Sequence, residues 1–499
     1  MLSGGRRPSD RLRLATRGTA ILGMAAMAAP LHAETLREAL AAAYASNPTI
    51  AGARATLEAA DEDVGIARAG GLPSASLTAQ ETENVKQDLA SPYSETLPRY
   101  VSAAATLSVP IYSGGAVKNA VRAADTRVLA GRADLAGTES SVFAQVVAAY
   151  LDVMQNSAIL GLNRAQVQTL VVNLKATQDR FQIGETTRTD VAQSQSRLAL
   201  AQGNQRTAEA NLANARETYV QLVGHAPVAL AEPPALPGLP ASVEAAVAEA
   251  LEHNPDLAAA HQRTAAARLD TRAATASRMP KISLFADGNY TNALNSLALV
   301  GGGASLPQTS TTADVGIRAT LPLYQGGQPT AQLRQAEARE GGALDTEIAT
   351  ERSIIAQVRA AWSSWQAAND VATSTATAVD AAKLSLEGVR AENSVGNRTI
   401  LDILNAEQEL VNAQVQLVTA RRNAYVAGFT LLAAMGRARA QDLGLGDTTR
   451  LYDPQVHYRA MRRAVGDWGD QQEVVTSATR TTTTPAQSAD LPAGDISVP

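Results

Sequence analysis

The segment VPIYSGGAVKNAV at residues 109–121 has a counterpart 212 residues later, LPLYQGGQPTAQL at residues 321–333. Each copy ends a run of alternating apolar and polar residues and begins a long segment rich in alanine, with a Gly-Gly pair at the junction. Adjacent glycines allow the sharp change of direction that a strand-to-helix junction needs. The sequence therefore predicts a strand that leads directly into a long helix, twice in one chain.

The duplication extends over most of the chain. An Asn-Pro pair followed at the same distance by a second proline occurs first at Pro48 and Pro73, then at Pro255 and Pro280. A glycine turn, IGETTRTDV and later VGNRTILDI, also occurs twice. Its shared positions are Gly184, Thr187 and Asp190 in the first copy and Gly396, Thr399 and Asp402 in the second. A repeat of this length indicates one architectural unit used twice.

These boundaries divide the 499 residues into five parts. The tail has too little apolar content to fold near its end, so we expect it to be largely disordered after about residue 470. The five parts are a signal peptide (1–33), a first structural repeat (34–224), a proline-rich linker (225–240), a second structural repeat (241–438) and a C-terminal tail (439–499).

The first part has the features of a secretory signal. Five arginines precede the apolar run AILGMAAMAA, and a small residue, Ala33, stands where cleavage is expected. The mature chain would then begin at Glu34 outside the cytoplasm. Because the sequence contains no cysteine, lipid attachment at a new N-terminal cysteine, disulfides and thiolate metal sites are excluded.

Two segments have the period of two that is typical of strands. Apolar and polar residues alternate from Val101 to Ile111 and again from Ala313 to Leu323. A run of about 10 such residues has the length and pattern of a strand in the wall of an outer-membrane barrel. Matching strands begin after Pro73 and Pro280, which gives four strands per chain. Four strands cannot close a barrel, and lipid does not tolerate unpaired edges, so several chains must share one barrel.

The rest of each repeat is predicted to be helical. Apolar residues recur every seven positions from Val146 to Phe181, and again from Val358 to Leu386. A sustained seven-residue period indicates coiled-coil packing. Since no strong breaker stands between about residues 115 and 182, this helix could be about 100 Å long. The shorter helices before the strands and after the glycine turn could together line it, so each repeat is a strand pair mounted on a two-helix column.

With these features the chain resembles the TolC family of outer-membrane efflux proteins over residues 35–438. The Asn-Pro helices, the LPLYQGG junction, the VGNRTILDILNAEQELVNAQ turn and the AAMG ending carry the resemblance. It implies an α+β membrane protein with an internal duplication. In such a protein a trimeric, twelve-stranded outer-membrane β-barrel, with four strands per chain, continues into a long α-helical coiled-coil tunnel in the periplasm.

The resemblance also implies a location and a set of partners. The protein would lie in the cell outer membrane, with a long periplasmic portion, as a homotrimer in contact with outer-membrane lipid. It would serve as the exit duct of an efflux or type I secretion system, together with a periplasmic adaptor protein and an inner-membrane transporter of the ABC or proton-driven type. It would be gated at the periplasmic helix tips.

By the same resemblance, individual residues of the two glycine turns receive roles. Arg398 would hold its tip to Asp190 of a neighbouring helix pair as a gate latch, and Asp402 and Asn405 would line the lumen at the tip. Asn393 replaces a tyrosine that serves the family as a second latch group, so a weaker latch is expected. Asn405 replaces an acidic residue, which predicts weaker selection for cations.

The residues alone leave a simpler interpretation of these turns open. An aspartate at the start of a helix is commonly a cap or a partner of the helix dipole, and Asp190 and Asp402 fit that description. Arg398 taken by itself fits a solvated side chain.

Other classes of function find little support. The five histidines are scattered without metalloprotease spacing, and no phosphate-binding glycine loop precedes a helix, so we expect no enzyme, no metal and no cofactor. The net charge of −5 argues against a nucleic-acid partner. A trimeric coiled-coil surface stalk, structural or adhesive, is the alternative to a duct. The tail segment LYDPQVHYRAMRRAVGDW resembles that of family members associated with protein secretion, so small-molecule efflux and protein export both remain open.

Overall fold

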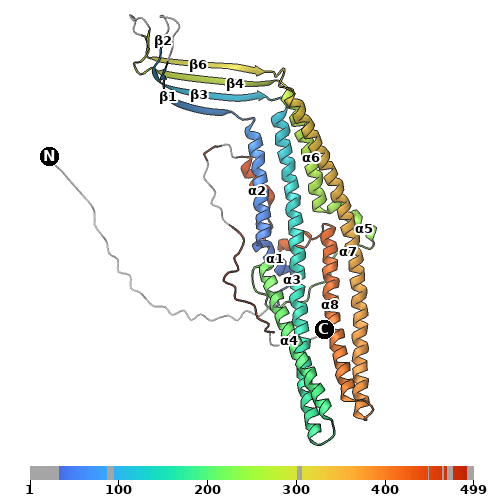
Figure 1. Cartoon of the computed structure of the whole chain (residues 1–499). Helices are drawn as coiled ribbons and strands as arrows, with labels where there is room; N and C mark the ends of the chain where they lie inside the picture. Colours follow the sequence, from blue (N-terminus) through green and yellow to red (C-terminus); the bar gives the residue numbers. More distant parts are fainter. Residues whose placement is uncertain are drawn as a thin grey trace, which may run out of the picture.

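The computed structural model describes residues 33–86, 95–299, 306–447, 449–463, 466–468 and 476–491. Apart from Ala33, the predicted signal peptide lies outside these ranges. A β-sheet stands at one end of a long helical column, and two helix turns lie at the other end (Figure 1). The chain is therefore elongated, and its repeats run side by side.

The sheet has four antiparallel strands, two from each repeat, as the sequence predicted. Their order is β1-β3-β4-β6, so the two outer strands come from different repeats. Two shorter strands, β2 and β5, pair with each other in the loops beyond the sheet. The strands are β1 (Ser74–Glu83), β2 (Glu95–Thr96), β3 (Arg99–Tyr112), β4 (Lys281–Asn292), β5 (Ala298–Leu299) and β6 (Thr309–Thr320).

The strand register shows where the two repeats join in the sheet. Val101 of β3 faces Asn292 of β4, and this central pairing joins the two repeats inside one sheet. Large apolar side chains lie exposed on this sheet, among them Leu77 at 77% and Val315 at 85% of their full area. An apolar surface of this kind on a soluble protein would be costly, whereas it suits contact with lipid.

Two long helices form the column, and both match the uninterrupted segments predicted from the sequence. They are α3 (Ala116–Gln182) and α7 (Gln328–Ser394), each 67 residues long and so about 100 Å in length. Each begins directly after a glycine in the left-handed region, Gly115 at φ 87° and Gly327 at φ 84°. These are the Gly-Gly junctions, where a residue with a Cβ atom would be strained.

Shorter helices complete the column. In the first repeat α2 and α4 pack against α3; in the second, α8 packs against α7, while α6 lies against both α3 and α7 and so joins the repeats. None of the helices in the described ranges is both long enough and apolar enough to cross a membrane. The bounds are α2 (Pro48–Ala69), α4 (Arg188–Val223), α6 (Pro255–Thr275) and α8 (Ile400–Ala434).

Most heptad positions are buried along the column, and exposure increases only at the turns. Val146, Val153 and Leu160 of α3 are buried, and so are Val358, Val379 and Leu386 of α7. Phe181 at the end of α3 is 45% exposed. The last turn of a helix has neighbours on fewer sides, which reduces burial there.

The main core lies midway along the column, where α1, α3 and α4 meet the residues that follow α8. Its largest fully buried side chains are Phe143, Tyr150, Leu160, Leu212 and Tyr219. The remaining elements surround this level or lie beside α2. They are α1 (Leu36–Ser46), α5 (Val243–His253), α9 (Pro454–Met461) and two short 3₁₀ turns, Ala276–Arg278 and Leu445–Asp447.

The disorder expected after about residue 470 falls partly on residues outside the described ranges, and it stays a prediction. Residues 476–491 form no regular secondary structure, yet Arg164 donates to the carbonyl of Ala489 at 3.2 Å and Arg216 donates to that of Asp490 at 2.9 Å. Leu491 packs against the main core. Arginine donors on α3 and α4 therefore replace the backbone partners that an irregular segment lacks.

A buried carboxyl group in the middle of α3 makes part of the stability depend on pH. Glu139 lies against the segment after α8, where the backbone of Ala440 donates to it. Burial raises the pKa of Glu139 to about 7, and Arg54 and Arg439 oppose this rise. Since this pKa is above that of an unfolded chain, the contribution of the group is full below about pH 4 and is lost as the pH rises through about 7.

We predict that Glu139→Gln flattens the pH dependence of thermal unfolding. The apparent melting temperature of the wild-type protein should fall between pH 5 and pH 8 more than that of the variant, because only the wild type must bury a charge. The exposed Glu409 provides a matched control, and Glu409→Gln should follow the wild type. Parallel melting curves for Glu139→Gln and wild type would show that this carboxyl does not titrate in the range.

Candidate functional site

The candidate site is the pair of glycine turns at the end of the column opposite the sheet (Figure 1). Gly184, at φ 83°, lies between α3 and α4, and Gly396, at φ 82°, lies between α7 and α8. In the first turn the Glu185 N–H donates to the carbonyl of Arg180 at 2.9 Å, which closes the end of α3. The corresponding bond in the second turn, from Asn397 to Glu392, is also 2.9 Å long. The two turns are the same structure, as the sequence predicted.

Each turn is followed by a capping box. The Thr187 N–H and hydroxyl donate to Asp190 Oδ2 at 2.9 and 2.8 Å, and the Asp190 N–H donates back to the Thr187 hydroxyl at 3.3 Å. Thr399 and Asp402 repeat this at 2.9, 2.8 and 3.2 Å. The capping role considered for these aspartates is therefore confirmed.

The boxes also fix the charge of the two aspartates. Hydrogen bonds from the backbone and the hydroxyl of Thr187 lower the pKa of Asp190, and those from Thr399 lower the pKa of Asp402. A lowered pKa means that the contribution to stability is present above the unfolded value of about 4 and is lost as the pH falls below it. Both groups are anions at neutral pH, as a latch and an acidic lumen would require.

Arg398 pairs within its own turn. Its Nε donates to Glu392 Oε2 at 2.7 Å, and its carbonyl accepts from the Asn393 side chain at 2.7 Å. Asn393 thus closes its own turn. Pairing of Arg398 with Asp190 would join different helix pairs, and it stays a prediction. Within the chain, Glu392 is the partner that such a latch must compete with.

The two helix pairs of the chain touch each other just above the turns. Leu404 of α8 is 3% exposed and packs with Val167, Leu170 and Ala201, which come from α3 and α4. Arg197 of α4 donates to Asn405 Oδ1 at 2.8 Å. Asn405, predicted to line the lumen, therefore also bonds across the two pairs.

A buried carboxylate adds a third contact between the pairs. Glu407 is 5% exposed; its Oε1 accepts from Arg390 of α7 at 2.8 Å, and its Oε2 accepts from Asn173 of α3 at 3.2 Å. Sequence reasoning missed Leu404, Arg197 and Glu407. For Glu407 the sequence did contain a signal of burial. It stands three residues before Leu410 in the apolar seam of α8, so an acidic residue occupies a heptad-type position.

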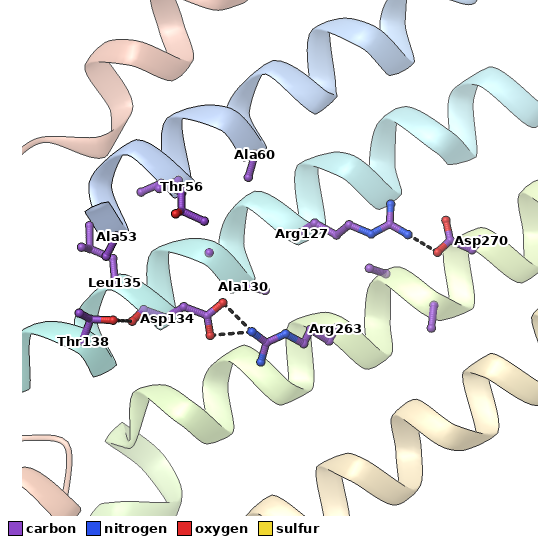
Figure 2. Close-up of a pocket in the computed structure, with 14 residues that line it drawn as sticks. Ala53, Thr56, Ala60, Arg127, Ala130, Asp134, Leu135, Thr138, Arg263 and Asp270 are labelled. Atoms are coloured by element: carbon purple, nitrogen blue, oxygen red, sulfur yellow. Dashed lines mark hydrogen bonds and ion pairs between the residues drawn. The ribbon is translucent and has the colours of Figure 1, made fainter. Parts of the chain in front are cut away.

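A second candidate is a groove of about 630 Å³ between α2, α3 and α6, shown in Figure 2. Arg263 donates to Asp134 at 2.6 and 2.8 Å, and Arg127 pairs with Asp270. Both ion pairs join α6 to α3, so they hold the second repeat against the first. The other lining residues are mainly alanines and threonines. In the described ranges no cluster of acidic and histidine side chains is arranged for a metal ion. We therefore assign this groove a structural role.

Comparison with known proteins gives consistent results. The sequence pattern of the family described as "Outer membrane efflux protein" matches residues 39–225 and 246–437, one span in each repeat. The outer membrane efflux protein BepC of Brucella suis is 32% identical over 89% of this chain and 93% of its own length. The outer membrane protein TolC of Escherichia coli is 28% identical, covering 83% of this chain and 84% of its own.

The fold is also found among solved structures. The CmeC outer membrane channel of Campylobacter jejuni superposes with a TM-score of 0.71 over 86% of this chain and 89% of its own. Its sequence identity is 16%, so this likeness concerns the fold alone.

We predict that Leu404→Ala separates the two helix pairs near the turns. Removal of this side chain should cost about 2–4 kcal/mol of local packing between them. Because the sequence contains no cysteine, spin labels at Glu185→Cys and Asn397→Cys can report the distance between the turns. That distance should become longer and more broadly distributed. Leu417→Ala is the matched control, since Leu417 packs between α7 and α8 within one pair. An unchanged distance in Leu404→Ala would mean that this contact does not hold the turns.

Proposed function

The chain belongs to the outer membrane efflux protein family, and from that premise we propose that it is the exit duct of a tripartite efflux or type I secretion system, gated at its two helix turns. As a TolC-family channel it is a transport protein and not an enzyme, and it lies in the outer membrane with its helical part in the periplasm. The alternative of a surface stalk is set aside, because the family is one of channels.

The observation that carries the proposal is a sheet with two open edges that leads directly into the helical column. β1 and β6 are its outer strands, and neither has a further strand partner among the residues that the structure describes. In lipid such edges must be paired. Three copies would pair β6 of each copy with β1 of the next, and their columns would continue the closed wall as a tunnel. We therefore propose a homotrimer, with the exposed sheet face in contact with outer-membrane lipid.

The proposed partners follow from the position of the turns. They lie about 100 Å from the sheet, where a periplasmic adaptor protein and an inner-membrane transporter could reach them. The cargo stays open between small molecules and exported proteins. The resemblance of the tail to members associated with protein secretion supports the second, and BepC, named as an efflux protein, supports the first.

The proposed gate has contacts of two strengths. Within a chain, the packing of Leu404 and the buried Glu407 hold the two helix pairs together. Between chains, an Arg398–Asp190 pair would be solvated and so worth only ~1 kcal/mol. The weaker contact should break first when an adaptor engages the turns. Opening would then move whole helix pairs apart while each capped turn stays intact.

We predict that Arg398→Ser raises single-channel conductance in a planar bilayer above that of the wild type. Loss of a pair worth ~1 kcal/mol changes an open population roughly fivefold. Asp190→Asn should raise it as well, and the double variant should add little, because both remove one interaction. If Glu392→Gln opened the channel and Asp190→Asn did not, the latch would lie within the turn. If Arg398→Ser conducted like the wild type at every voltage, the latch proposal would be wrong, while the duct proposal would stand.

We predict that Asp402→Asn weakens the block of the current by multivalent cations added from the periplasmic side. Three carboxylates around one axis attract such cations, and the amide removes the charge while it can still accept the bonds of the cap. Asp63→Asn serves as the control, because Asp63 is exposed on α2, far from the turns. Unchanged block in Asp402→Asn would exclude this residue from the lumen.

A further inference from the structure

The short helix α9 carries unpaired positive charge close to the sheet end of the column. It lies beside α2, with Tyr452 bonded to Glu58 at 3.2 Å and His457 to Asp61 at 3.2 Å, and the Arg462 carbonyl accepts from Arg68 at 3.1 Å. These contacts proceed along α2 in step with the sequence. α9 therefore runs parallel to α2 and points toward the sheet.

The end of α9 reaches the level where the membrane must begin. Arg68 stands six residues before Ser74, the first residue of β1, which is at most about 17 Å of chain. β1 has 10 residues, and a tilted strand needs about 9–11 to cross the hydrocarbon layer. Since the strand has almost no length to spare, its first residue lies near the periplasmic headgroups. Arg462, beside Arg68, lies within reach of them.

Four arginines stand near this level: Arg68 in the last turn of α2, Arg459 in the last turn of α9, and Arg462 and Arg463 directly after α9. Within the described part of the chain, none of the four forms an ion pair with a carboxylate, unlike Arg127, Arg263, Arg390 and Arg422 of the column. Arg462 and Arg463 are exposed at the end of α9. Asp467 offsets one of the four charges.

An exposed tryptophan follows these arginines in the sequence, five residues after Arg463. Trp468 is 99% exposed, whereas Trp362 and Trp365 pack against a buried cluster. Exposure of a whole indole to water is unfavourable, and tryptophan is enriched at the interface between lipid and water. Cations and an indole together match an anionic headgroup layer, because phosphates attract guanidinium groups and the indole enters the boundary.

We propose that the end of α9 and residues 466–468 form a binding surface for anionic phospholipids of the periplasmic leaflet of the outer membrane. The tail would thereby connect the column to the membrane beside the barrel. This inference depends on the outer-membrane location and is independent of the proposed gate at the turns.

The test uses Trp468 as a reporter in the full-length protein. With Trp362→Phe and Trp365→Phe, Trp468 is the only tryptophan. Trimers are placed in phosphatidylethanolamine nanodiscs that contain brominated phosphatidylglycerol or, for comparison, brominated phosphatidylethanolamine. We expect brominated phosphatidylglycerol to quench Trp468 severalfold more strongly. If the double variant does not form trimers, the difference between wild type and Trp468→Phe gives the same signal.

Charge reversal then separates lipid binding from simple proximity. Arg462→Glu with Arg463→Glu should reduce the preference for the anionic lipid to about one, because each arginine near an anionic surface strengthens attraction roughly fivefold. Arg180→Glu with Arg188→Glu, an equal charge change at the first glycine turn, should leave it unchanged. Equal quenching by both lipids in the wild type would overturn the proposal. Shielding of Trp468 from acrylamide in detergent without added phospholipid would overturn it as well, since another copy of the chain would then cover the surface.

Discussion

A β-strand in lipid cannot leave its backbone N–H and C=O groups without partners, and this constraint governs the molecule. In the described part of the chain this sheet has four strands, and the outer two, β1 and β6, come from different repeats. A sheet of this kind is complete only when further copies continue it. The strand-to-helix junctions at Gly115 and Gly327 then transmit the arrangement of the strands to the helices. Closure of the barrel and closure of the tunnel are thus consequences of the same pairing.

Side-chain burial varies along the helical column, and this variation suits a duct with a gate. Large side chains such as Tyr150 and Leu212 are buried midway along it, while the apolar residues in the turns themselves, Ile183 and Val395, are 71% and 70% exposed. Capping boxes keep each turn intact without extensive packing, because Thr187 and Thr399 satisfy the free ends of α4 and α8 locally. A turn that is locally stable and weakly attached can move as a unit. The contacts at Leu404 and Glu407 set how strongly it is attached within one chain.

Much of this site could be read from the sequence, and the failures have a common cause. The spacing Gly-x-x-Thr-x-x-Asp predicted two equivalent turns, because a capping box is a local structure that three residues encode. The bond from Arg197 to Asn405 and the burial of Glu407 join helices more than 200 residues apart in the chain, so no local pattern contains them. The contacts of Arg164 and Arg216 with residues 489–490 were missed for the same reason.

The sequence by itself determined the periodic features of this protein. Alternation and the prolines ahead of it indicated the four strands, the seven-residue period indicated the two long helices, and offsets of 207 and 212 residues between matching segments indicated the duplication. These follow from the geometry of single strands and helices, which depends on near neighbours in the chain. Only the tertiary structure decided that α6 joins the two repeats, that Arg398 pairs with Glu392, and that α9 runs along α2 toward the sheet. Each of these depends on which helix faces pack together in three dimensions. Many sequences with the same periodicity would allow a different packing.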